Sequence, residues 1–205
     1  MGIISNGTSI FDSGSMAAGL GSSITFIKKL TASSSSTLSF VNGSSNVVLD
    51  STYKEYLFTF KNIHPQTDDT GFMFNLSIDT GSNYNVTKTT TNFRAFHSEA
   101  GDGVDLRIET TTDLIQSTAF QDLTREDSGN DNDECIGGFL HLFNPSSTTF
   151  VKHFLATTNS THEADYSHEN FVGGYGNTTS AVDAVQFKMS SGNIDAGDIC
   201  LYGIS

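Results

Sequence analysis

The densest group of side chains that could bind a cation lies in one acidic stretch of the chain, residues 126–134. Carboxylates this closely spaced around a glycine could supply the roughly six to eight oxygen ligands that Ca²⁺ takes. The spacing does not match the EF-hand loop, which needs its own glycine position and a distal glutamate. A solvated acidic loop is therefore the favoured interpretation, with a Ca²⁺ site as the alternative. The candidate Ca²⁺ ligands are Asp127, Asp131, Asp133 and Glu134.

Two histidine–glutamate pairs, His162–Glu163 and His168–Glu169, lie six residues apart in a polar stretch. Their spacing matches neither the HExxH motif nor another pattern of metal ligands. We interpret the stretch as a loop with incidental histidines, and a metal site is the less favoured alternative.

No nucleophile stands out in the sequence. The G-x-S-x-G motif is missing, and neither Cys135 nor Cys200 has the electropositive neighbours that activate a thiol. Both cysteines lie in apolar runs, which favours buried free thiols and leaves a disulfide open. A polysaccharide hydrolase or lyase would need two carboxylates that converge in one cleft. They would come from Asp102, Asp105, Glu109, Glu163, Asp165 and Glu169.

The charge of the chain restricts its partners. Ten Lys and Arg stand against 23 Asp and Glu, which gives a net charge of −13. A chain this acidic lacks the basic stripe that neutralises phosphates, so we expect no nucleic-acid partner. The first ten residues resemble no signal peptide and no run is long enough to span a bilayer, so we expect no membrane insertion.

The elements that would position these residues are mostly strands. Sixteen Phe, no Trp and 19 Gly are typical of aromatic strands joined by tight turns. Alternating patterns separated by turn residues predict an all-β fold, an antiparallel β-sandwich. Only residues 113–123 have helical spacing. The expected strands are 24–27, 37–41, 53–60, 72–78, 92–97, 138–143, 150–157, 170–175, 184–189 and 199–204.

The first 22 residues differ from the rest of the chain. Short apolar pairs alternate with Gly, Ala and Ser, a composition that cannot form a core. We therefore predict an extended N-terminal arm over residues 1–22, which anchors the chain to a partner, and one sandwich domain over residues 23–205.

Five segments together resemble a known family. They read FIKKLTASSSSTLSF (26–40), LDSTYKEYLF (49–58), NIHP (62–65), HLFNPSS (141–147) and LYGI (201–204). This series is similar to a large, mostly uncharacterised family of virion structural proteins of marine tailed phages, of the cyanophage and pelagiphage kind. The resemblance covers residues 23–205 and implies a jelly-roll-like sandwich on the virion, often trimeric. It carries no catalytic residues.

We therefore expect a non-enzymatic virion structural protein, without cofactors, exposed on the particle surface after assembly in the host cytoplasm. A homotrimeric tail fibre or spike component is favoured over a capsid decoration protein, and residues 1–22 would bind other virion proteins. Aromatic rings stack on sugars, so loops around Tyr84, Tyr166 and Tyr175 could contact host glycans, although ordinary hydrophilic loops explain them as well. Alternatives of other classes are a jelly-roll polysaccharide hydrolase or lyase and a free carbohydrate-binding module.

Overall fold

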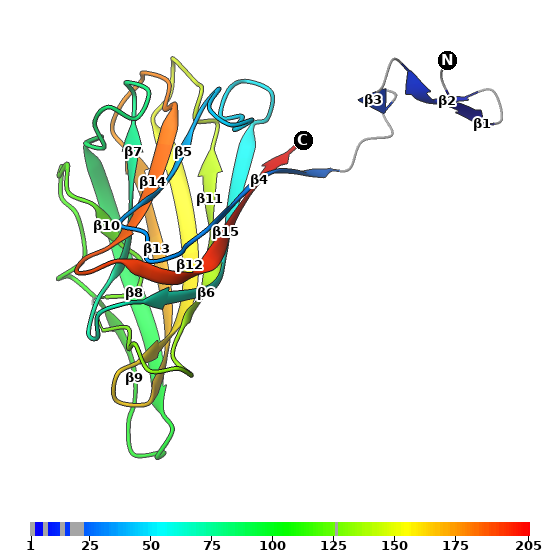
Figure 1. The fold of residues 1–205 in the computed structure, drawn as a ribbon. Coiled ribbons are helices and arrows are strands. Elements are labelled where there is room, and N and C mark those ends of the chain that lie inside the picture. The colour runs from blue at the N-terminus through cyan, green and yellow to red at the C-terminus, as the bar shows by residue number, and fades with distance from the viewer. Residues whose placement is uncertain (1–2, 6–7, 13–14, 17–22, 126) are drawn as a thin grey trace.

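The computed structural model describes residues 3–5, 8–12, 15–16, 23–125 and 127–205, and their regular structure consists of strands (Figure 1). Within residues 1–22, the segments β1 (Ile3–Ser5), β2 (Thr8–Asp12) and β3 (Ser15–Met16) pair as a small antiparallel sheet. The rest of the predicted arm lies outside the described residues.

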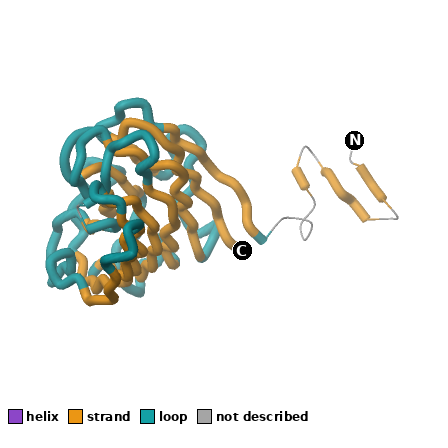
Figure 2. The backbone as a smooth tube through the Cα atoms, turned by 90° about the horizontal axis from the view of Figure 1, so that it is seen from below, coloured by secondary structure: helices purple, strands orange, loops and turns teal. Residues whose placement is uncertain are grey.

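Two antiparallel sheets form the body of the protein. The four-stranded sheet has the order β10-β7-β14-β5, from Gln121–Asp122, Phe72–Ser77, Ala184–Met189 and Leu38–Val41. The eight-stranded sheet has the order β4-β15-β6-β11-β12-β13-β8-β9. Its strands are Ile24–Thr31, Ile194–Ile204, Glu55–Pro65, Ile136–Phe143, Lys152–His162, Tyr166–Gly176, Lys88–Ser98 and Val104–Ile108. The predicted antiparallel β-sandwich is confirmed, and its loops gather at the ends of the strands (Figures 1 and 2).

Aromatic rings fill the space between the two sheets. Phe187 of β14 is fully buried, and its ring centroid lies 5.3 to 6.3 Å from those of five other phenylalanines. The alternation of β6 explains this core, because Tyr56, Phe58 and Phe60 point inward at every second position. The five neighbours of Phe187 are Phe40, Phe58, Phe60, Phe72 and Phe74.

The prediction of a helix over residues 113–123 is wrong. The segment is an irregular connection whose backbone groups bond to β8: Lys88 and Ser117 exchange both N–H···O=C bonds. Its apolar residues also do not share one buried face, since Leu123 is fully buried and Ile115 is 84% exposed. Pairing with the strand replaces the internal hydrogen bonds that a helix would have needed.

The strand β15 occupies an internal position in the eight-stranded sheet, between β6 and β4. Cys200 of β15 and Cys135, just before β11, are free thiols. Both are partly exposed, so the expectation that they are buried is wrong. Within the part of the chain that the structure describes, no helix has the length and apolarity needed to cross a membrane.

Candidate functional site

A group of ionisable side chains gathers inside the sandwich, towards the end that carries β9 and the β12–β13 turn (bottom of Figure 1). Strands β8, β12 and β13 contribute three of its members, and the segments after β9 and β10 contribute the others. We call this group the Arg94 cluster. It consists of Arg94, Glu109, Arg125, Asp127, His162 and His168.

Two guanidinium groups and two carboxylates alternate at the centre of the Arg94 cluster. Arg94 Nε lies 3.3 Å from Glu109 Oε1, and Arg94 Nη1 lies 3.7 Å from Asp127 Oδ2. Arg125 donates to the same two carboxylates, from Nε to Glu109 Oε2 and from Nη1 to Asp127 Oδ2, each at 2.5 Å. The side chains of Arg94, Glu109 and Asp127 are at most 6% exposed. The free-energy cost of burying each charge is therefore offset only by its oppositely charged partners.

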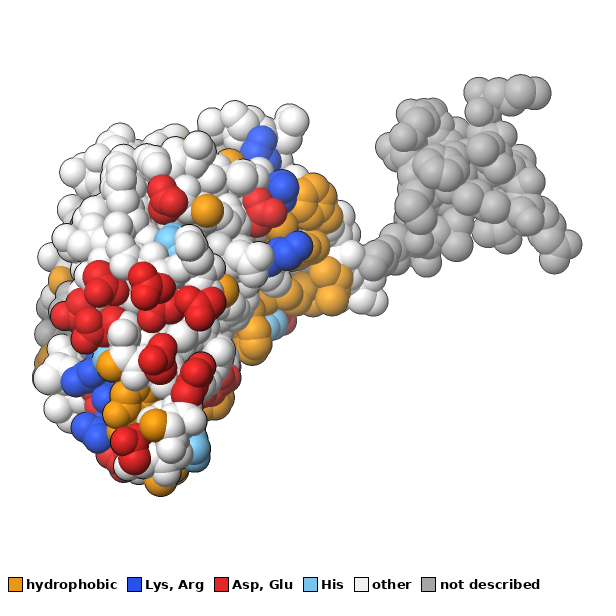
Figure 3. All heavy atoms as spheres, turned by 60° about the horizontal axis from the view of Figure 1, so that its bottom comes forward, with side chains coloured by type: hydrophobic (Ala, Val, Ile, Leu, Met, Phe, Trp, Pro, Cys, Tyr) orange, Lys and Arg blue, Asp and Glu red, His pale blue; other side chains and the backbone are white. Residues whose placement is uncertain are grey.

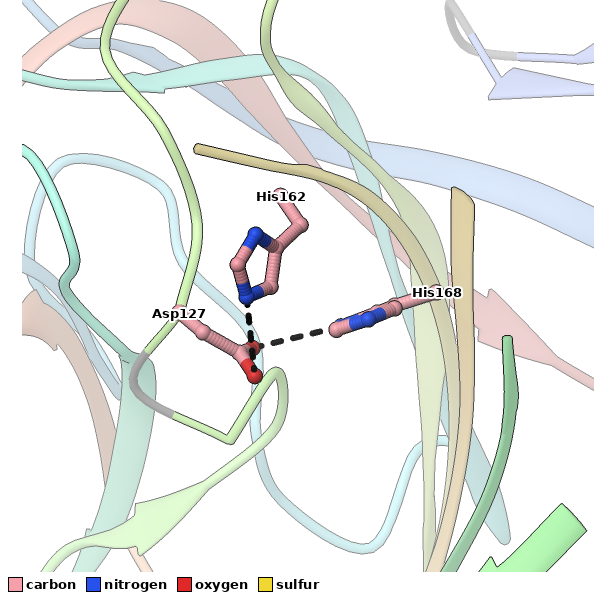
Figure 4. A group of neighbouring side chains, drawn as sticks. All are labelled: Asp127, His162 and His168. Carbon is pink, nitrogen blue, oxygen red and sulfur yellow. Dashed lines mark hydrogen bonds and ion pairs between the residues drawn. The ribbon is translucent and has the colours of Figure 1, made fainter. Parts of the chain in front are cut away.

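The two histidines complete the surroundings of Asp127 (Figure 4). His168 Nδ1 lies 3.3 Å and His162 Nε2 lies 3.8 Å from the carboxylate. Burial raises the pKa of Asp127, but hydrogen bonds and charges from His168 and Arg125 outweigh it, and the net pKa is below the ordinary value. For His162, burial lowers the pKa of the imidazole. Both effects favour an ionised Asp127 beside a neutral His162 at neutral pH.

The ligand atoms of Asp127, His162 and His168 lie within 4.8 Å of one another, close enough to suggest a metal centre. The guanidinium groups argue against that interpretation. Asp127 Oδ2 already accepts from Arg125, so a divalent cation would have to displace this guanidinium and add charge to a balanced set of two cations and two anions. The cluster is therefore best described as a buried ion-pair network.

Two clefts open beside the Arg94 cluster, with Arg125 and His162 lining both. The larger has a volume of about 430 Å³, and Asp69, Asp122 and Asp127 also line it. The smaller, of about 310 Å³, is lined by Arg94, Phe96, Ala164, Tyr166 and His168 as well. These walls offer hydrogen-bonding groups and a few aromatic rings to a small polar ligand.

The three tyrosines expected to face a glycan do not share one site. Tyr166 lines the smaller cleft, whereas Tyr175 lines a hollow on the other face of the sheet. The two lie nine residues apart on β13, which corresponds to about 30 Å along a strand. Tyr84 lies in the loop between β7 and β8.

Most of the carboxylates considered for catalysis are engaged by other side chains. Glu109 belongs to the Arg94 cluster, Asp102 accepts a hydrogen bond from Ser98, and Asp105 pairs with Arg107. Glu169 accepts a hydrogen bond from Asn159 Nδ2. The two remaining acids, Glu163 and Asp165, lie in the β12–β13 turn.

The four Ca²⁺ candidates fall into two groups. Asp127 is held by Arg125 and the histidines, whereas Glu134 Oε2 accepts the backbone N–H of Asp131 within a turn. Asp133 is exposed beside that turn. The structure brings Asp127 together with His162 and His168 instead, and these histidines belong to strands, so their interpretation as loop residues is wrong.

A second feature is the outer face of the eight-stranded sheet, the face that points away from the four-stranded sheet. Register pairs define two rows of side chains across it. One row is Ile108, Phe93, Phe171, Thr157, Phe139, Thr59, Cys200 and Lys29. The other is Thr91, Gly173, Leu155, His141, Leu57, Tyr202 and Phe26. Lys29 is the one Lys, Arg, Asp or Glu in these two rows.

Apolar side chains on this outer face contact one another while they are exposed to solvent. The rings of Phe93 and Phe171 stack with centroids 4.8 Å apart and an interplanar angle of 10°. Beside them, Gly173 leaves hollows of about 350 and 530 Å³ next to Leu155. In Figure 3, hydrophobic side chains gather along the right-hand side of the sandwich, apart from a concentration of Asp and Glu side chains at the lower left.

Comparison with known proteins adds no relative: no family model, curated protein or solved structure matches the chain.

Proposed function

We propose that the chain is a non-enzymatic structural protein of a tailed-phage particle, exposed on the particle surface, whose copies associate through the outer face of the eight-stranded sheet. The observation that carries this proposal is the apolar character of that face in a chain of net charge −13. Acidic copies repel one another in general, and they approach best where carboxylates are sparse. The resemblance of residues 23–205 to phage virion proteins supports the same role.

The outer face exposes a large apolar area, which in a ring would be shared between the two interfaces of each copy. Eight large apolar side chains of the outer face are between 39% and 75% exposed. At roughly 150 to 200 Å² for a fully exposed side chain, the lower part of the range for aromatic residues, they present on the order of 800 Å². A standard interface buries about 800 Å² on each partner. The eight residues are Ile24, Phe26, Phe93, Val104, Leu106, Ile108, Phe139 and Leu155.

The arrangement of these residues favours a ring over a two-fold dimer. They are concentrated on the two edge strands, with Ile24 and Phe26 on β4 and Val104, Leu106 and Ile108 on β9. A contact between unlike edges of neighbouring copies is heterologous and closes into a ring when the rotation permits. We propose a homotrimer, the ring size that the family resemblance implies.

Replacing Leu106 with glutamate is expected to convert the homotrimer into monomers, because a carboxylate would be buried in each copy of the interface. Light scattering coupled to gel filtration measures the mass, which should fall from that of three 22.0 kDa chains to that of one. Ile78→Glu is the matched control, because Ile78 is 43% exposed and directly follows β7 of the four-stranded sheet. A wild-type monomer, or a Leu106→Glu trimer, would refute the proposed interface.

Within this role we favour a tail fibre or spike component that contacts host glycans, with the two clefts beside the Arg94 cluster as the binding surface. Tyr166 and Phe96 in the smaller cleft could stack on a sugar, and Arg125 could bond its hydroxyl groups. Residues 1–22 would bind other virion proteins. The alternative within the same class is a capsid decoration protein.

Gold-labelled antibody against the purified protein, applied to intact particles and viewed by electron microscopy, tests the location. Label at the tail is expected, and label spread over the head would favour the capsid decoration protein. Intact particles that carry no label would overturn the surface role. Incubating the purified protein with host polysaccharide tests the enzyme alternative, because a hydrolase would release reducing ends and a lyase unsaturated products.

A further inference from the structure

Lys88, the first residue of β8, is a buried lysine whose partners in the described part of the chain are uncharged. Its side chain is fully buried, and Nζ donates to Asn75 Oδ1 at 2.5 Å and to the backbone oxygen of Val86 at 2.8 Å. Among the described residues, no carboxylate forms an ion pair with it. Burying an unpaired ammonium is costly, so the environment favours the neutral amine.

The amine is available as a nucleophile at neutral pH. Burial lowers the pKa of Lys88 to about 7, so a large part of the population carries an unprotonated Nζ. A desolvated neutral lysine is one of the activated nucleophiles that proteins use. The group that faces the Lys88 amine is the side-chain carboxamide of Asn75.

The carboxamide of Asn75, on β7, is held in place by four hydrogen bonds. Its Nδ2 donates to the backbone oxygens of Tyr84 at 2.6 Å and Thr118 at 3.0 Å. Its Oδ1 accepts from Lys88 and also from the backbone N–H of Leu76 at 2.8 Å. The Leu76 N–H therefore points at the oxygen that would become negative if Cγ were attacked, as the donor of an oxyanion hole does.

The two reacting atoms are close. A carbonyl bond is about 1.2 Å long, so Asn75 Cγ lies at most about 3.7 Å from Lys88 Nζ. Reacting atoms in near-attack arrangements are about 3 to 3.5 Å apart. A small movement of Nζ from the oxygen towards the face of the carbonyl is enough to reach that range.

We propose that Lys88 and Asn75 join in an intramolecular isopeptide bond. The lone pair of Nζ attacks Cγ, a proton passes from Nζ to Nδ2, and the Cγ–Nδ2 bond breaks with release of ammonia. The reaction is a transamidation, so it changes no oxidation state and needs no co-reactant. The new bond links β7 of the four-stranded sheet to β8 of the eight-stranded sheet.

Lys152 provides an internal comparison. It is also fully buried, but its Nζ donates to two backbone carbonyls, those of Phe150 at 2.6 Å and Thr178 at 3.2 Å. A peptide carbonyl is part of the chain, and its attack would cut the backbone without joining side chains. Burial alone therefore does not make a lysine a candidate for the isopeptide bond. Lys88 differs from Lys152 because a side-chain carboxamide lies beside its amine.

The test is the mass of the purified full-length protein under denaturing conditions. The bond predicts a loss of about 17 Da, the mass of ammonia, from the sequence mass. Trypsin should leave Lys88 uncleaved and give one peptide, residues 62–94, that carries the whole loss. This location distinguishes the bond from a succinimide at Asn42–Gly43, which loses the same mass elsewhere.

Two variants and one control complete the experiment. Asn75→Ala and Lys88→Arg should each abolish the loss of mass, whereas Lys152→Arg should retain it. A wild-type protein of full sequence mass that trypsin cleaves after Lys88 would overturn the proposal. That outcome is decided on the wild-type protein and does not depend on whether any variant folds.

Discussion

Replacing Arg94 with methionine is expected to lower the free energy of unfolding by about 3 to 5 kcal/mol, the usual cost of removing one partner from a buried ion pair. Methionine preserves much of the side-chain volume, so the loss would come from charge and hydrogen bonding. Glu109 and Asp127 would keep Arg125 as their only guanidinium partner within the Arg94 cluster, although both are almost fully buried. Chemical denaturation at neutral pH measures the change.

Arg107→Met is the matched control for that experiment. The Arg107 side chain is 45% exposed and pairs with the similarly exposed Asp105, and its Nε lies 3.9 Å from Glu109 Oε1, beyond hydrogen-bonding distance. Exposed ion pairs contribute about 0 to 1 kcal/mol, so this variant should unfold almost like the wild-type protein. Equal and small effects of the two substitutions would show that Arg94 is not the centre of a buried network.

Replacing Phe187 with alanine is expected to lower the free energy of unfolding by about 3 to 5 kcal/mol, because a large cavity would open among its five ring neighbours. The midpoint of thermal unfolding should fall by roughly 10 °C for a chain of this size. Calorimetry or circular dichroism measures that shift.

Phe150→Ala serves as the control for Phe187→Ala, because the Phe150 side chain is 67% exposed. It should shift the midpoint by no more than a typical surface substitution does. If Phe187→Ala unfolded at the wild-type temperature, the aromatic packing between the sheets would not be the main support of the sandwich.

Strand positions could be predicted from the sequence where one side of the strand is apolar and the other polar. The expected strand 184–189 coincides with β14, and 72–78 differs from β7 by one residue. Segments that are strands only because they pair with a neighbouring strand could not be predicted from the alternation of apolar and polar residues. The two-residue strand β10 exists because Gln121 and Asp122 pair with β7.

The Arg94 cluster could not be assembled from the sequence because β8 and β13 invert the usual alternation. Asn92 and Arg94 point into the sandwich while Phe93 between them points out, and on β13 Asn170 is buried beside Phe171 on the outer face. Alternation alone gives the period of a strand and not which side is covered. The available signal was the placement of Asn and Arg directly beside phenylalanine, in Asn92-Phe93-Arg94 and in Asn170-Phe171.

The placement of β15 has a consequence for how the protein folds. It pairs with β4 over a long sequence separation, as in the contact between Thr31 and Asp198, 167 residues apart. Contacts this distant must close a very long loop, and proteins dominated by such contacts fold slowly, in milliseconds to seconds. Until β4 docks, the free edge of β15 can pair with a strand of another molecule. The yield of native protein on refolding should therefore depend on how dilute the unfolded chains are.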